Sequence, residues 1–148
     1  MQENDVACQK NAKISIPEYQ LFETLGKGGF GTVYKAKQSR TQQLVAVKVL
    51  QLNPETPALQ RRRQIDRFDR EAQLCAQIHH PNIVRLLDKG QSDEFTLFAV
   101  FEYVPGQTLK TLLLSEGALS AHETAELMGQ VLDALACAHA QGIVHRDL

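Results

Sequence analysis

The chain has 148 residues, which is the size of one domain. Apolar residues make up 43% and charged residues 22%, proportions that exclude a disordered or low-complexity chain. Sixteen Lys and Arg residues against seventeen Asp and Glu residues give a net charge of -1, without the basic excess of a nucleic-acid binder. We therefore expect a folded protein with no nucleic-acid partner.

The composition also bears on the compartment. The longest apolar run, residues 97–101, is far shorter than the ~20 residues of a membrane span, and the polar residues 1–13 are unlike a signal peptide. Three widely spaced cysteines, Cys8, Cys75 and Cys137, fit a reducing compartment better than a disulfide framework. We expect a cytoplasmic chain with no membrane segment, and the composition leaves its oligomeric state open.

The first half of the chain carries strand patterns. Residues 1–18 show no apolar period and are expected to form a flexible leader. Alternating apolar residues predict strands around residues 21–25 and 30–36, joined by a cluster of glycines. Residues 44–50 are almost entirely apolar, which predicts a third strand covered on both faces.

A helix and two further strands complete this half. The apolar spacing predicts a helix over residues 58–78 and strands over residues 83–87 and 96–103. The polar residues 88–94 are expected to form the turn between these strands. Residues 19–103 would therefore form one strand-rich unit.

Helices dominate residues 104–148. A short helix is predicted over residues 108–114. Ser120 and Glu123 have the spacing of a capping box and predict the start of a long helix, which Gly142 is suited to end. A strand-rich half followed by a helical half is typical of an α+β fold rather than of alternating βαβ units.

The segment Gly26-Lys-Gly-Gly-Phe-Gly31 matches the pattern G-x-G-x-x-G. Glycines let a backbone turn tightly and bring its N–H groups close to phosphate oxygens. In a dinucleotide-binding fold the motif would open a helix, but residues 32–36 alternate as a strand. The remaining interpretations are a strand–turn–strand flap over nucleotide phosphates and an ordinary glycine-rich hairpin turn.

Two charged residues occupy apolar patterns. Lys48 lies inside the third strand, where its ammonium needs either an anionic partner or a route to solvent. On a helical wheel Glu71 falls within the apolar arc that includes Ala72 and Cys75. We expect a buried-face carboxylate that pairs with Lys48, the alternative being a rim position with the tip in water. Asp147 can either cap a turn or accept a proton from a substrate hydroxyl.

Together these residues resemble the first half of a eukaryotic-type (Hanks-type) Ser/Thr protein kinase domain, and the bacterial members most. The resemblance covers residues 19–148 and rests on five motifs in order, which are Leu25-Gly-Lys-Gly-Gly-Phe-Gly-Thr-Val-Tyr34, Val45-Ala-Val-Lys48, Glu71, His80-Pro-Asn-Ile-Val84 and His145-Arg-Asp-Leu148. It implies an N-lobe of antiparallel sheet plus the family's αC helix over residues 19–103. Residues 104–148 would contain the hinge and the first helices of the C-lobe.

The resemblance implies an ATP site. The residues that would cover the phosphates are Gly26, Lys27, Gly28, Gly29, Phe30 and Gly31. Those that would surround or read the adenine are Val33, Ala46, the gatekeeper Phe101, the Glu102 carbonyl and the Val104 amide. Lys48 would hold the α- and β-phosphates and pair with Glu71, and Asp147 would be the catalytic base.

The implied activity is transfer of the ATP γ-phosphate to Ser or Thr hydroxyls of a protein substrate. The 148 residues contain no Asp-Phe-Gly magnesium motif, so Mg²⁺ is expected only in a full-length parent, and this fragment alone is expected to be inactive. The alternative is a short kinase-like module that binds nucleotide or a partner without catalysis. No metal site is expected, since the histidines lack metal-site spacing.

Overall fold

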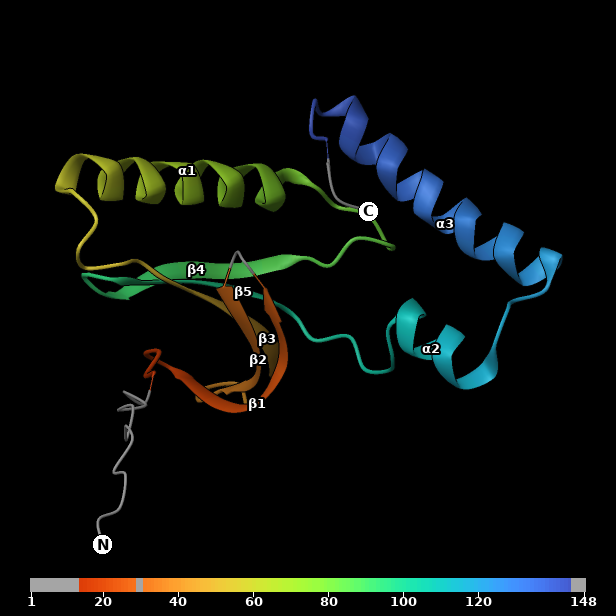
Figure 1. Cartoon of the computed structure of the whole chain (residues 1–148), viewed down its shortest axis with the longest axis horizontal. Helices are drawn as coiled ribbons and strands as arrows, with labels where there is room; N and C mark the ends of the chain where they lie inside the picture. The colour runs from red at the N-terminus through yellow and green to blue at the C-terminus, as the bar shows by residue number, and fades with distance from the viewer. Residues whose placement is uncertain (1–13, 29–30, 145–148) are drawn as a thin grey trace, which may run out of the picture.

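The computed structural model describes residues 14–28 and 31–144 (Figure 1). In this part of the chain, strands precede helices, and one long helix is inserted between the third and fourth strands. The elements are β1 (Tyr19–Gly28), β2 (Gly31–Gln38), β3 (Leu44–Gln51), α1 (Ala58–Gln77), β4 (Leu86–Asp93), β5 (Thr96–Glu102), α2 (Leu109–Glu116) and α3 (Ala121–Ala140). The predicted α+β class is confirmed.

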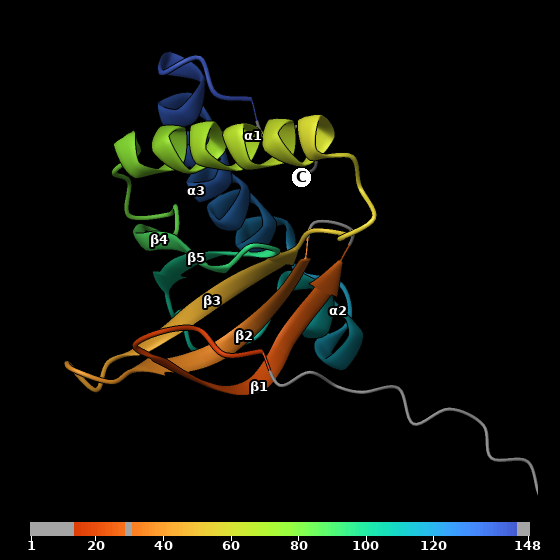
Figure 2. The same ribbon diagram turned by 90° about the vertical axis from the view of Figure 1, so that its left-hand side faces the viewer.

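The strands form a five-stranded antiparallel sheet in the order β1-β2-β3-β5-β4. After β3 the chain forms α1 and then β4, which lies at the edge of the sheet. The next strand, β5, lies between β3 and β4 and pairs with both. The two views show α1 running alongside β4, whereas α2 and α3 follow β5 outside the sheet (Figures 1 and 2).

The core lies on one face of the sheet. Val45, Val47 and Val49 alternate along β3 and are at most 2% exposed. Val47 lies opposite Val100, and Val49 opposite Phe98, so the two central strands bury the same face. The other face of β3 is half-buried, so the prediction of a strand covered on both faces holds fully for one face and partly for the other.

The predicted leader ends earlier than residue 18. Ile16 is 3% exposed and belongs to the core, where Ile14 also packs. Tyr19 donates a hydrogen bond of 2.9 Å from its hydroxyl to Asp88 of β4. Residues 14–18 therefore belong to the folded unit, because two apolar side chains spaced by two residues cover the sheet. Residues 1–13 lie outside the described residues.

The turn predicted over residues 88–94 is wrong. Most of these residues form β4, and the turn is confined to Glu94 and Phe95. Polar residues are tolerated in β4 because it is an edge strand with one side open to solvent. Gly90 also contributes, since a Cβ there would lie 2.6 Å from the ring of Phe98.

The helix ends agree with the sequence signals. The Ser120 hydroxyl accepts the N–H of Glu123, whose carboxylate accepts the N–H of Ser120, so the predicted capping box is confirmed. Gly142 follows α3 with a φ of 72°.

One side-chain hydrogen bond connects α3 to the preceding part of the chain. The Asn82 side-chain amide donates to the Gln130 side chain at 3.0 Å and thereby connects the loop after α1 to α3.

Candidate functional site

The half-buried face of the sheet carries several predicted site residues. Directly opposite residues in antiparallel strands point to the same face, and so do alternate residues of one strand. One cross-strand row, read from β2 to β4, contains Val33, Lys48, Ala99 and Lys89. The next row contains Lys35, Ala46, Phe101 and Leu86. The structure therefore brings the predicted adenine and phosphate residues of β2, β3 and β5 onto one face.

This face differs from the core face in exposure. Val33, Ala46, Lys48 and Phe101 are each half-buried on this face, and Ala99 in the middle of it is 4% exposed. Val47, between Ala46 and Lys48 in sequence, points to the opposite face and is fully buried. The result is a partly open apolar surface next to an ammonium group. Such a surface suits a flat apolar ring that carries anionic groups.

The glycine segment forms the end of a hairpin. The strand β1 ends at Gly28 and β2 begins at Gly31, which confirms that a strand, not a helix, follows the glycines. The dinucleotide-binding interpretation needs a helix there and is therefore excluded. Gly29 and Phe30 lie outside the described residues.

The three described glycines of the motif have different roles. Gly31 has a φ of 115°, and a Cβ there would lie 2.3 Å from the carbonyl oxygen of Val49. The fold itself therefore requires glycine at residue 31. Among the described residues, a Cβ at Gly26 or Gly28 would meet nothing within 4 Å. Space next to the backbone at residues 26 and 28 is thus open to a ligand.

Glu71 does not lie on a buried face, so that prediction is wrong. Its side chain is 61% exposed and accepts a hydrogen bond of 2.7 Å from the Arg67 guanidinium one turn earlier. The helical wheel placed Glu71 among apolar residues, but α1 runs along the edge strand and buries only Ala72 among its 20 residues. The apolar arc of α1 would be buried only where the helix packs against the core of the sheet.

The charges of Glu71 and Lys48 both affect the pKa of the Cys75 thiol. Burial raises the pKa of this thiol, the Glu71 carboxylate raises it further, and the Lys48 ammonium lowers it. Both charges therefore act on one sulfur atom, although they belong to α1 and β3. Pairing between Lys48 and Glu71 stays a prediction.

The predicted hinge is ordered at its start. Glu102 donates its backbone N–H to the Arg85 carbonyl at 3.1 Å, and its carboxylate accepts the Arg85 N–H at 2.7 Å. These bonds hold the end of β5 beside the segment that enters β4. Val104, in the connection to α2, is 63% exposed. Its N–H is therefore in an accessible stretch of chain.

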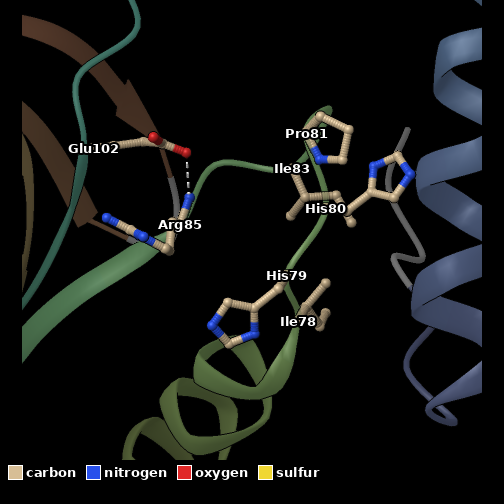
Figure 3. Close-up of a pocket in the computed structure, with 7 residues that line it drawn as sticks. All are labelled: Ile78, His79, His80, Pro81, Ile83, Arg85 and Glu102. Atoms are coloured by element: carbon tan, nitrogen blue, oxygen red, sulfur yellow. Dashed lines mark hydrogen bonds between the residues drawn. The ribbon is translucent and has the colours of Figure 1, made fainter.

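A pocket of about 340 Å³ lies beside this start of the hinge (Figure 3). Its lining comes from the loop after α1 and from the start of the hinge, and consists of Ile78, His79, His80, Pro81, Ile83, Arg85 and Glu102. Only Glu102 belongs to the predicted site. Sequence reasoning missed the pocket, because its residues carry no motif apart from His-Pro-Asn. They come together only because the loop after α1 folds back beside the end of β5.

The described residues also bear on the expectations for metal ions and membrane-spanning helices. No cluster of three His, Cys, Asp or Glu side chains that could hold a metal ion occurs in residues 14–28 and 31–144. In the same part of the chain, no helix has the length and apolar character needed to cross a bilayer. Asp147, the expected catalytic base, lies outside the described residues.

Comparison with known proteins gives a consistent result. The family model "Protein kinase domain" matches residues 19–148. Serine/threonine-protein kinase pkn3 of Myxococcus xanthus is 37% identical over 131 residues, which cover 88% of this chain and 23% of pkn3. Serine/threonine-protein kinase PrkC of Bacillus subtilis is 38% identical over 130 residues, covering 88% of this chain and 19% of PrkC. The chain thus spans about a fifth to a quarter of the length of these relatives. With this match over nearly its whole length, the chain belongs to the protein kinase domain family.

Proposed function

We propose that this chain is the ATP-binding portion of a Ser/Thr protein kinase, whose activity transfers the ATP γ-phosphate to Ser or Thr hydroxyls of a protein substrate. One observation carries the proposal: the strand register gathers Val33, Ala46, Lys48 and Phe101 on one partly open face. The names of the relatives support the Ser/Thr class.

The adenine would lie against the apolar part of this face. Val33 and Ala46 would contact the ring, with Phe101 at its inner edge. The Glu102 carbonyl and the Val104 N–H would form hydrogen bonds with the adenine edge. The Glu102 carboxylate is bonded to the Arg85 N–H, and the proposed adenine contact uses the backbone carbonyl rather than this side chain.

The phosphates would lie beneath the segment from Gly26 to Gly31, which includes Lys27, Gly28, Gly29 and Phe30. Bound ATP supplies the phosphoryl group. Lys48 would bind the α- and β-phosphates as a point charge. Glu71 would orient Lys48 after leaving Arg67, and this exchange costs little because exposed pairs one helical turn apart are weak.

We further propose that the 148 residues bind ATP without transferring phosphate. Asp147 would be the base in the longer protein, where Mg²⁺ would also bind. The alternative is a nucleotide- or partner-binding module that has no catalysis in any form. Assay of a longer reading frame separates the two, since phosphate transfer to a protein supports the kinase and its absence supports the module.

A cytoplasmic location is also proposed. The free thiols of Cys75 and Cys137 agree with a reducing compartment.

ATP binding to the 148-residue chain, measured by calorimetry, tests the proposal. Lys48→Ala should weaken binding by about tenfold or more, because a charged hydrogen bond contributes about 1.5–3 kcal/mol. Lys110→Ala, which removes an exposed lysine from α2, is the matched control and should bind ATP normally. Equal affinity of the wild type and Lys48→Ala would contradict the proposal.

A second variant separates ligand contact from folding. Gly28→Val adds a side chain at a Cβ position that has no described residue within 4 Å, so the thermal unfolding midpoint should stay near that of the wild type. ATP affinity should nevertheless fall, since the added methyls would occupy the space proposed for the phosphates. Unchanged affinity would place the phosphates elsewhere.

A further inference from the structure

The position of α1 depends on few apolar contacts. Ala72 is the one buried residue of this helix, Ile65 and Phe68 are half-buried, and Leu59 and Leu74 remain 66% and 38% exposed. Both views nevertheless show α1 parallel to β4 along its length (Figures 1 and 2). A helix with so small a buried face has low local stability, so directed polar contacts to the sheet matter for its position.

One such contact joins the middle of α1 to β4. The Lys89 ammonium lies 2.5 Å from an Asp69 carboxylate oxygen and also donates to the Asp69 backbone carbonyl at 3.5 Å. Lys89 belongs to the cross-strand row that contains Lys48, and Asp69 precedes Glu71 by two residues. This ion pair therefore joins the helix segment of Glu71 to the strand row of Lys48.

A second contact holds the first turn of α1. The Arg61 guanidinium forms an ion pair of 3.0 Å with Glu94 and lies 5.0 Å from the ring centre of Phe95, both in the turn between β4 and β5. It also donates to the carbonyl oxygens of Pro54 and Thr56. The Arg61 side chain is only 19% exposed.

The neighbouring arginine shows the contrast. Arg62 pairs with Asp66 of the same helix, and its side chain is 75% exposed. This pair adds nothing between helix and sheet. Arg62 and Asp66 therefore provide matched control positions on the same helix.

We infer that Lys89 and Arg61 are positioning residues, which fix α1 at two points along β4 and β5 and thereby set where Glu71 lies relative to Lys48. Two fixed points define the direction of a rigid helix, and loss of either lets it pivot about the other. The consequence for the nucleotide rests on the proposed function, but the two attachments do not.

The Cys75 thiol is a reporter of helix position that requires no nucleotide. It lies on α1 in an exposed residue, and partial burial of the sulfur is the largest cause of its raised pKa. In a Cys8→Ser, Cys137→Ser background, the alkylation rate with iodoacetamide measures how much the packing of α1 on the sheet shields this sulfur. Asp69→Lys and Lys89→Asp should each raise the rate about two- to fivefold, the range set by a partly exposed ion pair.

Charge exchange tests the pairing itself. The double variant Asp69→Lys, Lys89→Asp restores opposite charges and should return the rate to that of the background. Asp66→Lys, the control, should leave it unchanged. Single variants without effect, or a double variant that stays as fast as the singles, would overturn the inference. Asp69→Asn and Lys89→Gln replace the reversed charges if a reversed variant fails to fold.

Arg61→Gln and ATP affinity complete the test. Arg61→Gln should also raise the alkylation rate, whereas Arg62→Gln should not. ATP binding should weaken in the single variants and recover in the charge-exchanged double variant. If the rates change while only Lys48→Ala alters ATP affinity, the positioning role is overturned. If Lys48→Ala has no effect on affinity either, the proposed function fails but the attachment of α1 stands.

Discussion

The sheet and the helices are stabilised by different means. Along β3 and β5, Val47 and Val100 have no exposed surface, and their neighbours on the same face are nearly as buried. Among the helices, α1 and α3 each bury a single alanine, and α2 buries no residue. Leu114 and Leu132 are 80% and 59% exposed. Close packing therefore fixes the sheet, whereas ion pairs attach α1 to β4 and to the turn after it, and a capping box starts α3. Substitutions should cost far more in the sheet.

The largest effect is expected at Gly31. Gly31→Ala forces a side chain into a left-handed backbone conformation and against the Val49 carbonyl, which should lower the free energy of unfolding by about 3 kcal/mol or more. Urea denaturation followed by circular dichroism measures the loss. Gly26→Ala is the control and should change stability by less than about 0.5 kcal/mol. Equal losses in both variants would contradict the assignment of separate roles to these glycines.

A core valine and an exposed leucine compare the two regions directly. Val47→Ala should lower the free energy of unfolding by about 2 kcal/mol, through lost burial and a cavity. Leu132→Ala on α3 removes an exposed side chain and should cost less than about 0.5 kcal/mol. The same denaturation experiment applies. A larger loss for Leu132→Ala would show that α3 packs against something in solution.

Tyr19 makes the stability of the sheet pH-dependent. Burial and the neighbouring Asp88 carboxylate raise the pKa of Tyr19 from 10.0 to about 12. The folded protein therefore keeps a proton that the unfolded chain loses, so this contribution is complete below pH 10 and disappears as the pH rises through 12. Between these values Tyr19→Phe should flatten the fall in stability by up to about 1.4 kcal/mol per pH unit. Denaturation at pH 8, 10 and 11 gives the comparison, and parallel profiles would argue against the Asp88 contact.

A smaller loss is expected at the start of α3. Ser120→Ala removes the side-chain cap and should reduce stability by about 1 kcal/mol. The control is Ser115→Ala, because the Ser115 hydroxyl donates a hydrogen bond to the Leu112 carbonyl within α2 and caps no helix. Thermal unfolding of both variants separates the effect of the cap from that of an ordinary serine. If both variants lose the same stability, the cap is not the cause.

Local signals in the sequence predicted the elements whose structure depends on near neighbours. The apolar run of β3, the capping box at Ser120 and the glycine after α3 each have a local physical cause. The extent of β4 could not be predicted, because polar residues 88–93 form a strand only where β5 pairs with them. The face of Glu71 likewise depends on where α1 meets the sheet.

The candidate site divides in the same way. Alternation along β3 predicts that Ala46 and Lys48 share a face, but only the register with β2 and β5 adds Val33 and Phe101. The motif pattern treats its glycines as equivalent, whereas only the approach to Val49 distinguishes Gly31 from Gly26 and Gly28. The leader predicted from the lack of an apolar period includes Ile16, which nevertheless packs into the core.

The hydrogen bond from Tyr19 to Asp88 joins the two outermost strands, β1 and β4, across 69 positions of chain. A contact between residues so far apart in sequence stabilises the fold only late in folding, when the intervening strands have already assembled. Because the protein has no tryptophan and only three tyrosines, the emission of Tyr19 would provide a built-in optical signal for completion of the sheet.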